Sequence, residues 1–249
     1  MSTYNKFIGN DKAVPIVSND LFNGADNMRF ATILFGLGAH PKGVDQSLFS
    51  GYLSLRKNVY VDQTGILDAS EEFDAGTERD RDDSRSVHIA VFENHGDGKV
   101  AVIGCLRLIV KQDKEPLPIE VFYPEVFEQK PVKVGDVEMS RFISRAEKGK
   151  GDNYHIIMSL FGSSLNYALQ NGISFAYGVI ETKLWHAMQS LSSVSKKIGE
   201  LKMIEEYNTE NIGIAMDINE AHRDLARKGF TYMEMVPNKP YYWGTNAKS

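Results

Sequence analysis

The segment 100–110 constrains the fold more than any other part of the sequence. It reads Val-Ala-Val-Ile-Gly-Cys-Leu-Arg-Leu-Ile-Val and is apolar apart from Arg107. A nearly continuous apolar run is typical of a central β-strand covered on both faces. A guanidinium in such a strand is costly to bury unless carboxylates meet it. The segment therefore predicts a sheet with acidic side chains near Arg107, and Gly104 predicts a bulge or a close approach of backbone to ligand.

Hydrophobic periodicity predicts further helices and strands. We expect a helix from Leu48 to Val59, strands at 87–91, 137–144 and 174–180, helices at 152–170 and 184–191, and strand-like pieces at 212–218 and 230–235 around a short helix. His95-Gly-Asp-Gly is typical of a hairpin turn. Asp152 suits a helix N-cap and Gly172 a helix end. This order of elements predicts an α+β or mixed α/β fold.

Length and composition set the expected domain organisation. The chain has 249 residues and a mass of 27.9 kDa, with 42% hydrophobic and 24% charged residues, which suits one large domain with a full core. We expect residues 1–47 to form an irregular or lightly helical lead-in, because their periodicity is weak. Residues 48–249 should then form a single domain.

Composition also argues against several functional classes. No apolar run reaches about 18 residues, so no membrane-spanning helix is expected. The N-terminus shows no secretory signal, which favours a cytoplasmic location. Cys105 is the single cysteine, which excludes an internal disulfide and a cysteine-based zinc site, and no metal site is expected. A net charge of −5 and a pI near 5.7 argue against a nucleic-acid partner.

Three groups of charged residues accompany the strands: Glu78-x-Asp80-x-x-Asp83, Arg107, and Glu138-Met-Ser-Arg141-Phe142. Arginine pairs carboxylates bidentately through its planar guanidinium. One interpretation is an ion-pair network that fixes the charged loop 71–85 on the sheet. The other is a polar pocket for a small zwitterion, whose amine meets carboxylates and whose carboxylate meets arginine. The residues alone leave both open.

Four motifs in order carry a more specific signal: Leu55-Arg56 with Val59-Tyr60, Glu78-x-Asp80-x-x-Asp83, Gly104-Cys-Leu-Arg107-Leu and Glu138-Met-Ser-Arg141-Phe142. Across residues 50–145 their order and spacing resemble the acyl-homoserine-lactone (autoinducer) synthase family. The stretch 78–88 is also similar to long-chain N-acyl amino acid synthases and to acyltransferases linked to PEP-CTERM/exosortase systems. The resemblance implies a GNAT-like N-acyltransferase fold, with a central twisted mixed sheet flanked by helices.

The resemblance further implies an N-acyltransferase that moves a fatty acyl group from a carrier thioester to the amine of an amino acid or a close derivative. It implies catalytic roles for Glu138 and Arg141, with Glu138 taking the proton of the amine directly or through a water. The alternative is that Glu138 is the partner of a structural arginine and that a water or a backbone carbonyl is the base. The implied substrate-binding residues are Arg56, Glu78, Asp80, Asp83, Arg107, Ser140 and Phe142. His88 is a second candidate base, although a lone strand histidine is more often a packing residue. No bound cofactor is expected, because the acyl donor is itself a substrate.

The loop from Arg145 to Gly151 resembles the GNAT pyrophosphate loop with one residue more. Backbone N–H groups at a helix N-terminus bind phosphate. The expected acyl-donor contacts are Arg145, Lys148, Gly149, Lys150 and Gly151. The donor would be acyl-CoA or an acyl carrier protein. The carrier protein is the expected partner, because its acidic surface would face the basic residues of this loop. A solvated turn is the structural alternative.

The chain also departs from the autoinducer synthases. They usually place a Trp shortly after a Val-Phe pair, whereas this chain has Tyr60 for the Phe and Gly65-Ile66 at the position of the Trp. The departure disfavours an S-adenosylmethionine pocket and favours an amino-acid acceptor. A lactone synthase that uses S-adenosylmethionine stays open as one alternative. A non-catalytic acyl- or ligand-binding module on the same fold is the other.

Overall fold

The structure, a computed structural model, describes nine ranges of the chain: 15–17, 21–22, 28–41, 45–67, 76–96, 99–145, 150–191, 194–228 and 241–243. The chain divides into two compact units. Unit 1 comprises Met1–Arg107, Arg141–Ser163 and Met235–Ser249, and unit 2 comprises Leu108–Ser140 and Ser164–Glu234. The predicted single domain over residues 48–249 stays a prediction.

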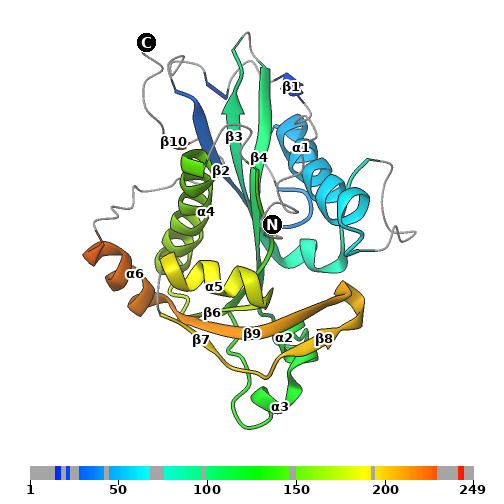
Figure 1. Cartoon of the computed structure of the whole chain (residues 1–249), viewed down its shortest axis with the longest axis vertical. Coiled ribbons are helices and arrows are strands. Elements are labelled where there is room, and N and C mark those ends of the chain that lie inside the picture. Colours follow the sequence, from blue (N-terminus) through cyan, green and yellow to red (C-terminus); the bar gives the residue numbers. More distant parts are fainter. Residues whose placement is uncertain are drawn as a thin grey trace. The chain divides into compact units, whose positions relative to one another are not determined.

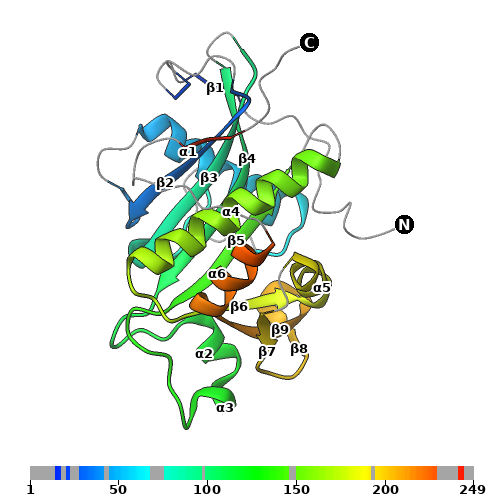
Figure 2. The same cartoon turned by 90° about the vertical axis from the view of Figure 1, so that its left-hand side faces the viewer.

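Unit 1 is built on strands in the order β10-β2-β3-β4-β5, with β1 also paired to β4. Helices α1 and α4 lie on opposite faces of these strands (Figures 1 and 2). The elements are β1 (Pro15–Val17), β2 (Phe30–Leu37), α1 (Gln46–Lys57), the π-helix η2 (Asn58–Gln63), the 3-10 helix η3 (Arg81–Arg85), β3 (Ser86–Asn94), β4 (Lys99–Val110), β5 (Val137–Ser144), α4 (Lys150–Gln170) and β10 (Tyr241–Trp243). Strands β4 and β5 and helix α4 continue into unit 2.

In unit 2 the strands follow the order β5-β6-β9-β7, and β8 also pairs with β9. The elements are α2 (Pro118–Phe122), α3 (Pro124–Phe127), β6 (Phe175–Glu181), α5 (Thr182–Leu191), β7 (Ser195–Lys197), β8 (Lys202–Ile204), the 3-10 helix η4 (Glu205–Tyr207), β9 (Thr209–Asp217) and α6 (Ile218–Arg227). β5 pairs in parallel with β6, and β6 pairs antiparallel with β9. The predicted mixed sheet with flanking helices is therefore confirmed.

The predicted irregular lead-in is wrong for residues 30–37, which form β2. This strand pairs antiparallel with β10 on one side and with β3 on the other. Its residues from Phe30 to Phe35 are all buried. A strand that is covered on both faces shows no alternation of apolar and polar residues, so periodicity could not reveal it.

The ends of the long helix α4 test two further expectations. The predicted N-cap at Asp152 is wrong, because α4 already begins at Lys150. The predicted stop at Gly172 is confirmed, since Gly172 has a φ of 66° and its N–H donates to the carbonyl of Leu169 at 3.2 Å. Residues 230–235, expected to be strand-like, lie outside the described residues.

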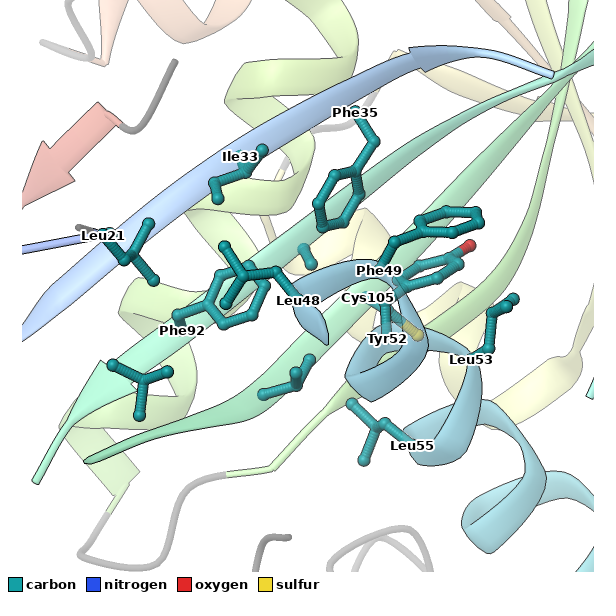
Figure 3. Packing of buried hydrophobic residues seen from close by; sticks show 14 of the residues in the cluster. Leu21, Ile33, Phe35, Leu48, Phe49, Tyr52, Leu53, Leu55, Phe92 and Cys105 are labelled. Atoms are coloured by element: carbon teal, nitrogen blue, oxygen red, sulfur yellow. The ribbon is translucent and has the colours of Figure 1, made fainter. Parts of the chain in front are cut away.

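One face of α1 packs on the sheet of unit 1 and forms its core (Figure 3). Phe49, Tyr52 and Leu55 are buried on this face. The ring centroid of Phe49 lies 5.3 Å from that of Phe35 on β2, and 5.5 Å from that of Tyr52. Burying each such aromatic side chain is worth roughly 1.5–3 kcal/mol. This packing fixes helix α1. It also buries Arg56, which lies in the last turn of the helix.

On the other face of β4, Gly104 lets helix α4 approach closely. A Cβ at this position would lie 2.5 Å from Cγ2 of Ile156 and 3.3 Å from both the Ile143 carbonyl oxygen and Cδ1 of Leu160. The sequence predicted a bulge or a close approach of backbone to ligand at Gly104, whereas the structure places side chains of α4 against it. No helix among the described residues is long and apolar enough to cross a membrane.

Candidate active site

Six charged residues of unit 1 form a closed ring of ion pairs, which we call the charge ring. In the order in which they pair, its members are Arg56, Glu78, Arg141, Asp80, Arg107 and Asp83, with Asp83 returning to Arg56. Each arginine meets two carboxylates and each carboxylate meets two arginines. The three positive and three negative charges are therefore balanced within the ring.

The contacts of the charge ring are short. Nη1 of Arg56 and Nη1 of Arg107 lie 2.7 Å and 3.0 Å from the same oxygen, Oδ1 of Asp83. Nη2 of Arg141 lies 2.8 Å from Oδ2 of Asp80. Hydrogen bonds between two charged groups are the strongest that proteins make. Truncating one member of a buried pair costs about 3–5 kcal/mol, because its partner keeps an uncompensated charge.

Local structure explains the spacing of the acidic residues. Asp80 is the N-cap of η3, and its carboxylate accepts the N–H of Asp82 at 2.9 Å. The carboxylate of Asp83 accepts the N–H of Asp80 at 2.9 Å and completes a capping box. The cap presents both carboxylates to Arg107 on β4. The structure thus contains the predicted ion-pair network between this segment and the sheet.

The arginines keep the carboxylates ionised. Burial opposes the ionisation of Asp80, yet the guanidinium groups of Arg107 and Arg141 lower its pKa to about 2. Burial also opposes the ionisation of Glu78 and Asp83, and neighbouring arginines again hold the pKa of each carboxyl below its usual range. These three carboxylates are therefore poor proton acceptors near neutral pH.

Only one end of the charge ring is open to solvent. Four of its side chains are at most 2% exposed. The side chain of Asp80 is 25% exposed and that of Arg141 is 11% exposed. A solute that reaches the ring therefore meets a carboxylate and a guanidinium side by side.

Arg141 has a left-handed backbone conformation within β5. Its φ is 53°, which costs an L-residue about 1–2 kcal/mol and requires support from its surroundings. Sγ of Cys105 donates to the Arg141 carbonyl at 3.2 Å, and the Tyr60 hydroxyl donates to the Phe142 carbonyl at 3.0 Å. Burial raises the pKa of Cys105 to about 12, so the thiol keeps its proton. The sequence singled out Tyr60 as part of a motif and as a departure from the usual Phe of the family, but it did not predict the contact of Tyr60 with β5.

His88 on β3 is fully buried. Its Nδ1 lies 3.1 Å from the hydroxyl of Tyr52, and its ring centroid lies 5.2 Å from that of Phe49. Burial lowers the pKa of His88 to about 3, so the imidazole is neutral at physiological pH. These contacts favour the packing alternative for His88 over a role as general base.

The other candidate residues of β5 lie in both units. Glu138, in unit 2, is buried, and its Oε2 accepts the N–H of Ile119 at 2.8 Å. Ser140, also in unit 2, is half-buried, and so is Phe142 in unit 1. The Phe142 ring lies 5.6 Å from that of Phe161 on α4. The general-base role of Glu138 stays a prediction, and its hydrogen bond to Ile119 gives it a structural role as well.

The candidate acyl-donor loop is described only in part. Arg145 is buried, and its N–H donates to the carbonyl of Ile103 at 2.7 Å. Its guanidinium therefore does not belong to an exposed basic surface. Lys148 and Gly149 lie outside the described residues, and of 150–151 only the backbone, in the first turn of α4, is described. Within the described ranges, no three His, Cys, Asp or Glu side chains are grouped to hold a metal ion.

Comparison with known proteins adds a family to this geometry. The sequence pattern of the family described as Autoinducer synthase matches residues 44–224. Among solved structures, the chain is similar to BjaI, a CoA-dependent acyl-homoserine lactone synthase with SAM and isopentyl-CoA, at 17% identity and a TM-score of 0.62, over 83% of this chain and 94% of that chain. The acyl-homoserine lactone synthase LasI gives 18% identity and a TM-score of 0.60 over 84% and 100% of the two chains. FeeM, an N-acyl amino acid synthase from uncultured soil microbes, gives 17% and 0.55 over 81% and 99%.

The fold and the family match together define an acyltransferase enzyme. The chain belongs to the autoinducer synthase family, as its four motifs predicted. No curated protein sequence matches it.

Proposed function

We propose that this chain is an N-acyltransferase that moves a fatty acyl group from a carrier thioester to the amine of an amino acid or a close derivative. The observation that carries the proposal is the open end of the charge ring, where Asp80 and Arg141 lie 2.8 Å apart. A free amino acid carries an ammonium and a carboxylate on the same carbon atom. Its ammonium complements Asp80, and its carboxylate complements the planar fork of Arg141.

The charge ring alone does not separate two possible acceptors, because S-adenosylmethionine carries the same ammonium and carboxylate as a free amino acid. The remainder of that molecule needs further contacts, and autoinducer synthases usually supply a Trp there. This chain has Gly65 and Ile66 at that place, just after the π-helix η2. Gly65 is exposed and has a φ of 60°. An amino acid without the adenosyl group is therefore the acceptor that we propose.

Acyl transfer requires the acceptor to lose a proton. The neutral amine attacks the thioester carbonyl, the C–N bond forms, and the C–S bond breaks as the carrier thiol leaves with a proton. The low pKa of Asp80 suits it to hold the ammonium and makes it a weak base. We therefore assign proton removal to Glu138, directly or through a water, and substrate orientation to Arg141. Acyl carrier protein is our proposed donor, and acyl-CoA is the competing source of the same thioester. A cytoplasmic location stays a prediction.

The product tests the proposal. The purified full chain is incubated with an acyl carrier protein bearing a defined fatty acid, together with either the common amino acids or S-adenosylmethionine, and the products are analysed by mass spectrometry. We expect an N-acyl amino acid in the first mixture and no acyl-homoserine lactone in the second. A lactone would identify an S-adenosylmethionine-dependent synthase. If neither product forms, with acyl-CoA as well as with the carrier protein as donor, the alternative that remains is the non-catalytic binding module.

A further inference from the structure

We infer that Tyr60 is a positioning residue that holds Arg141 in the conformation needed to bind the acceptor. The inference rests on the proposed function, because Arg141 is the group that meets the acceptor carboxylate. Tyr60 itself carries no charge and is not a member of the charge ring. It would act on the acceptor through Arg141.

The first observation is the way the helix carrying Tyr60 is built. Helix α1 runs to Lys57 and continues without a break as the π-helix over Asn58–Gln63. The wider turn is closed by the N–H of Thr64, which donates to the carbonyl of Val59 at 3.1 Å. A π-helical turn changes the direction of the side chains that follow, and such turns are frequent at functional sites. Here the altered turn carries the side chain that contacts β5.

The second observation is that Tyr60 contacts β5 at two consecutive residues. Its hydroxyl donates to the carbonyl of Phe142 at 3.0 Å. Its ring centroid lies 5.4 Å from Cζ of Arg141. Burial raises the pKa of Tyr60, so the hydroxyl keeps its proton and remains a donor. One side chain therefore supports both the backbone beside Arg141 and its guanidinium.

The third observation is that Arg141 requires such support. Its φ of 53° is unusual for any residue other than glycine. The ion pairs with Glu78 and Asp80 fix the guanidinium end of the side chain, not the backbone. Beside the pairing of β5 with β4, the side-chain donors Cys105 and Tyr60 support this backbone, because they donate to two successive carbonyl groups, those of Arg141 and Phe142. Removing the Tyr60 hydroxyl therefore loosens Arg141 and leaves every charge of the ring in place.

The test compares Tyr60→Phe with a matched variant, Tyr123→Phe. The hydroxyl of Tyr123, in unit 2, also donates to a backbone carbonyl, that of Asn211, at 2.9 Å. Both substitutions therefore remove one tyrosine–carbonyl hydrogen bond. Steady-state rates are measured with the acyl carrier protein donor and with the amino acid found in the product. We expect Tyr60→Phe to raise the KM for the amino acid about three- to tenfold, with the donor KM and kcat within about twofold. Tyr123→Phe should leave all three constants within about twofold, whatever it does to thermal stability.

A crystal structure of the Tyr60→Phe protein gives a second measurement that needs no activity. We expect Arg141 to leave the left-handed conformation, or its guanidinium to shift from Asp80. An unchanged Arg141 overturns the positioning role, even if the KM rises, because Tyr60 would then contact the acceptor directly. An Arg141 that moves without any change in KM also overturns the inference, because the conformation that Tyr60 holds would then not be needed to bind the acceptor. If the wild-type chain forms no acyl amino acid, the proposed function fails, and the crystal structure alone decides the inference.

Discussion

A buried arginine is stable only where its carboxylate partners are themselves held in place. In the charge ring each carboxylate is shared by two arginines, and Asp80 and Asp83 are also fixed by the capping box of η3. Apolar side chains of similar size would often be as stable in such a place. The function of the ring is therefore to hold a carboxylate and a guanidinium in fixed positions at its open end. Its structural and binding roles are two consequences of one arrangement.

At Glu138 the structural and catalytic roles can be separated by one substitution. Glutamine keeps an acceptor oxygen for the N–H of Ile119, so Glu138→Gln should retain the melting temperature within a few degrees. The amide cannot take a proton, so kcat should fall by roughly 10²- to 10⁴-fold if Glu138 is the general base. Thermal melts and steady-state rates on the same preparation check both. Wild-type turnover in the variant would leave Glu138 only its structural role.

The buried His88 should make stability depend on pH. Its pKa is about 3 in the folded chain, against an ordinary value of 6.5, because burial disfavours the charged form. Between these values the unfolded chain binds the extra proton, so the free energy of unfolding falls as the pH falls through this range. From pH 7 to pH 5 this single group should cost the folded state about 2 kcal/mol.

The matched protein is His88→Gln, which offers an acceptor to the Tyr52 hydroxyl and does not titrate. Urea denaturation at pH 7 and pH 5 should show a smaller loss of stability in the variant, by about the same 2 kcal/mol. Equal losses in the two proteins would mean that His88 is protonated in the folded state. The burial argument would then be wrong.

Among the elements, the crossing of α4 over β4 depends on the missing side chain of Gly104. Gly104→Ala places a methyl group 2.5 Å from Cγ2 of Ile156, and should cost about 1–3 kcal/mol in the free energy of unfolding. Ile156→Ala removes the clashing atom, so the same Gly104→Ala change should cost much less in that background. Chemical denaturation of the four proteins gives the coupling energy. A similar cost in both backgrounds would place the close contact elsewhere, at the carbonyl of Ile143 or at Cδ1 of Leu160.

The helices and strands also show which parts of the fold could be predicted from the sequence. Where one face of an element is apolar, as in α1, or where a whole run is apolar, as in β4, the pattern predicted the element correctly. Strand β2 was not predicted, because it is covered on both faces and its partner β10 lies far away in the sequence. The members of the charge ring were all anticipated, but not their closed order, since pairing depends on which strands are neighbours. The π-helix and the left-handed Arg141 leave no mark in residue spacing at all.

At the scale of the whole molecule, the charge of the chain bears on the choice between acyl carrier protein and acyl-CoA as donor. The chain has a net charge of −5, so an acidic carrier protein is repelled overall and needs a local basic surface to dock. Arg145 is buried and does not contribute to such a surface. The expected docking charges are therefore reduced to Lys148 and Lys150, which precede the body of α4. A CoA donor depends less on them, because backbone N–H groups at a helix start supply much of its phosphate binding.

Lys148→Glu together with Lys150→Glu reverses both of these charges. Its matched control is Lys196→Glu with Lys197→Glu on β7, where both lysines are exposed, so the two proteins carry the same net charge. With the same acyl chain on each donor, the first variant should lose at least about tenfold in kcat/KM with acyl carrier protein, equivalent to about 1.4 kcal/mol, and less with acyl-CoA. Added salt should shrink the difference from wild type, because it screens charges in solvent. If the control loses as much, the effect belongs to net charge. If neither donor responds, the loop from Arg145 to Gly151 is a solvated turn, and the carrier-protein docking site must be sought elsewhere on the chain.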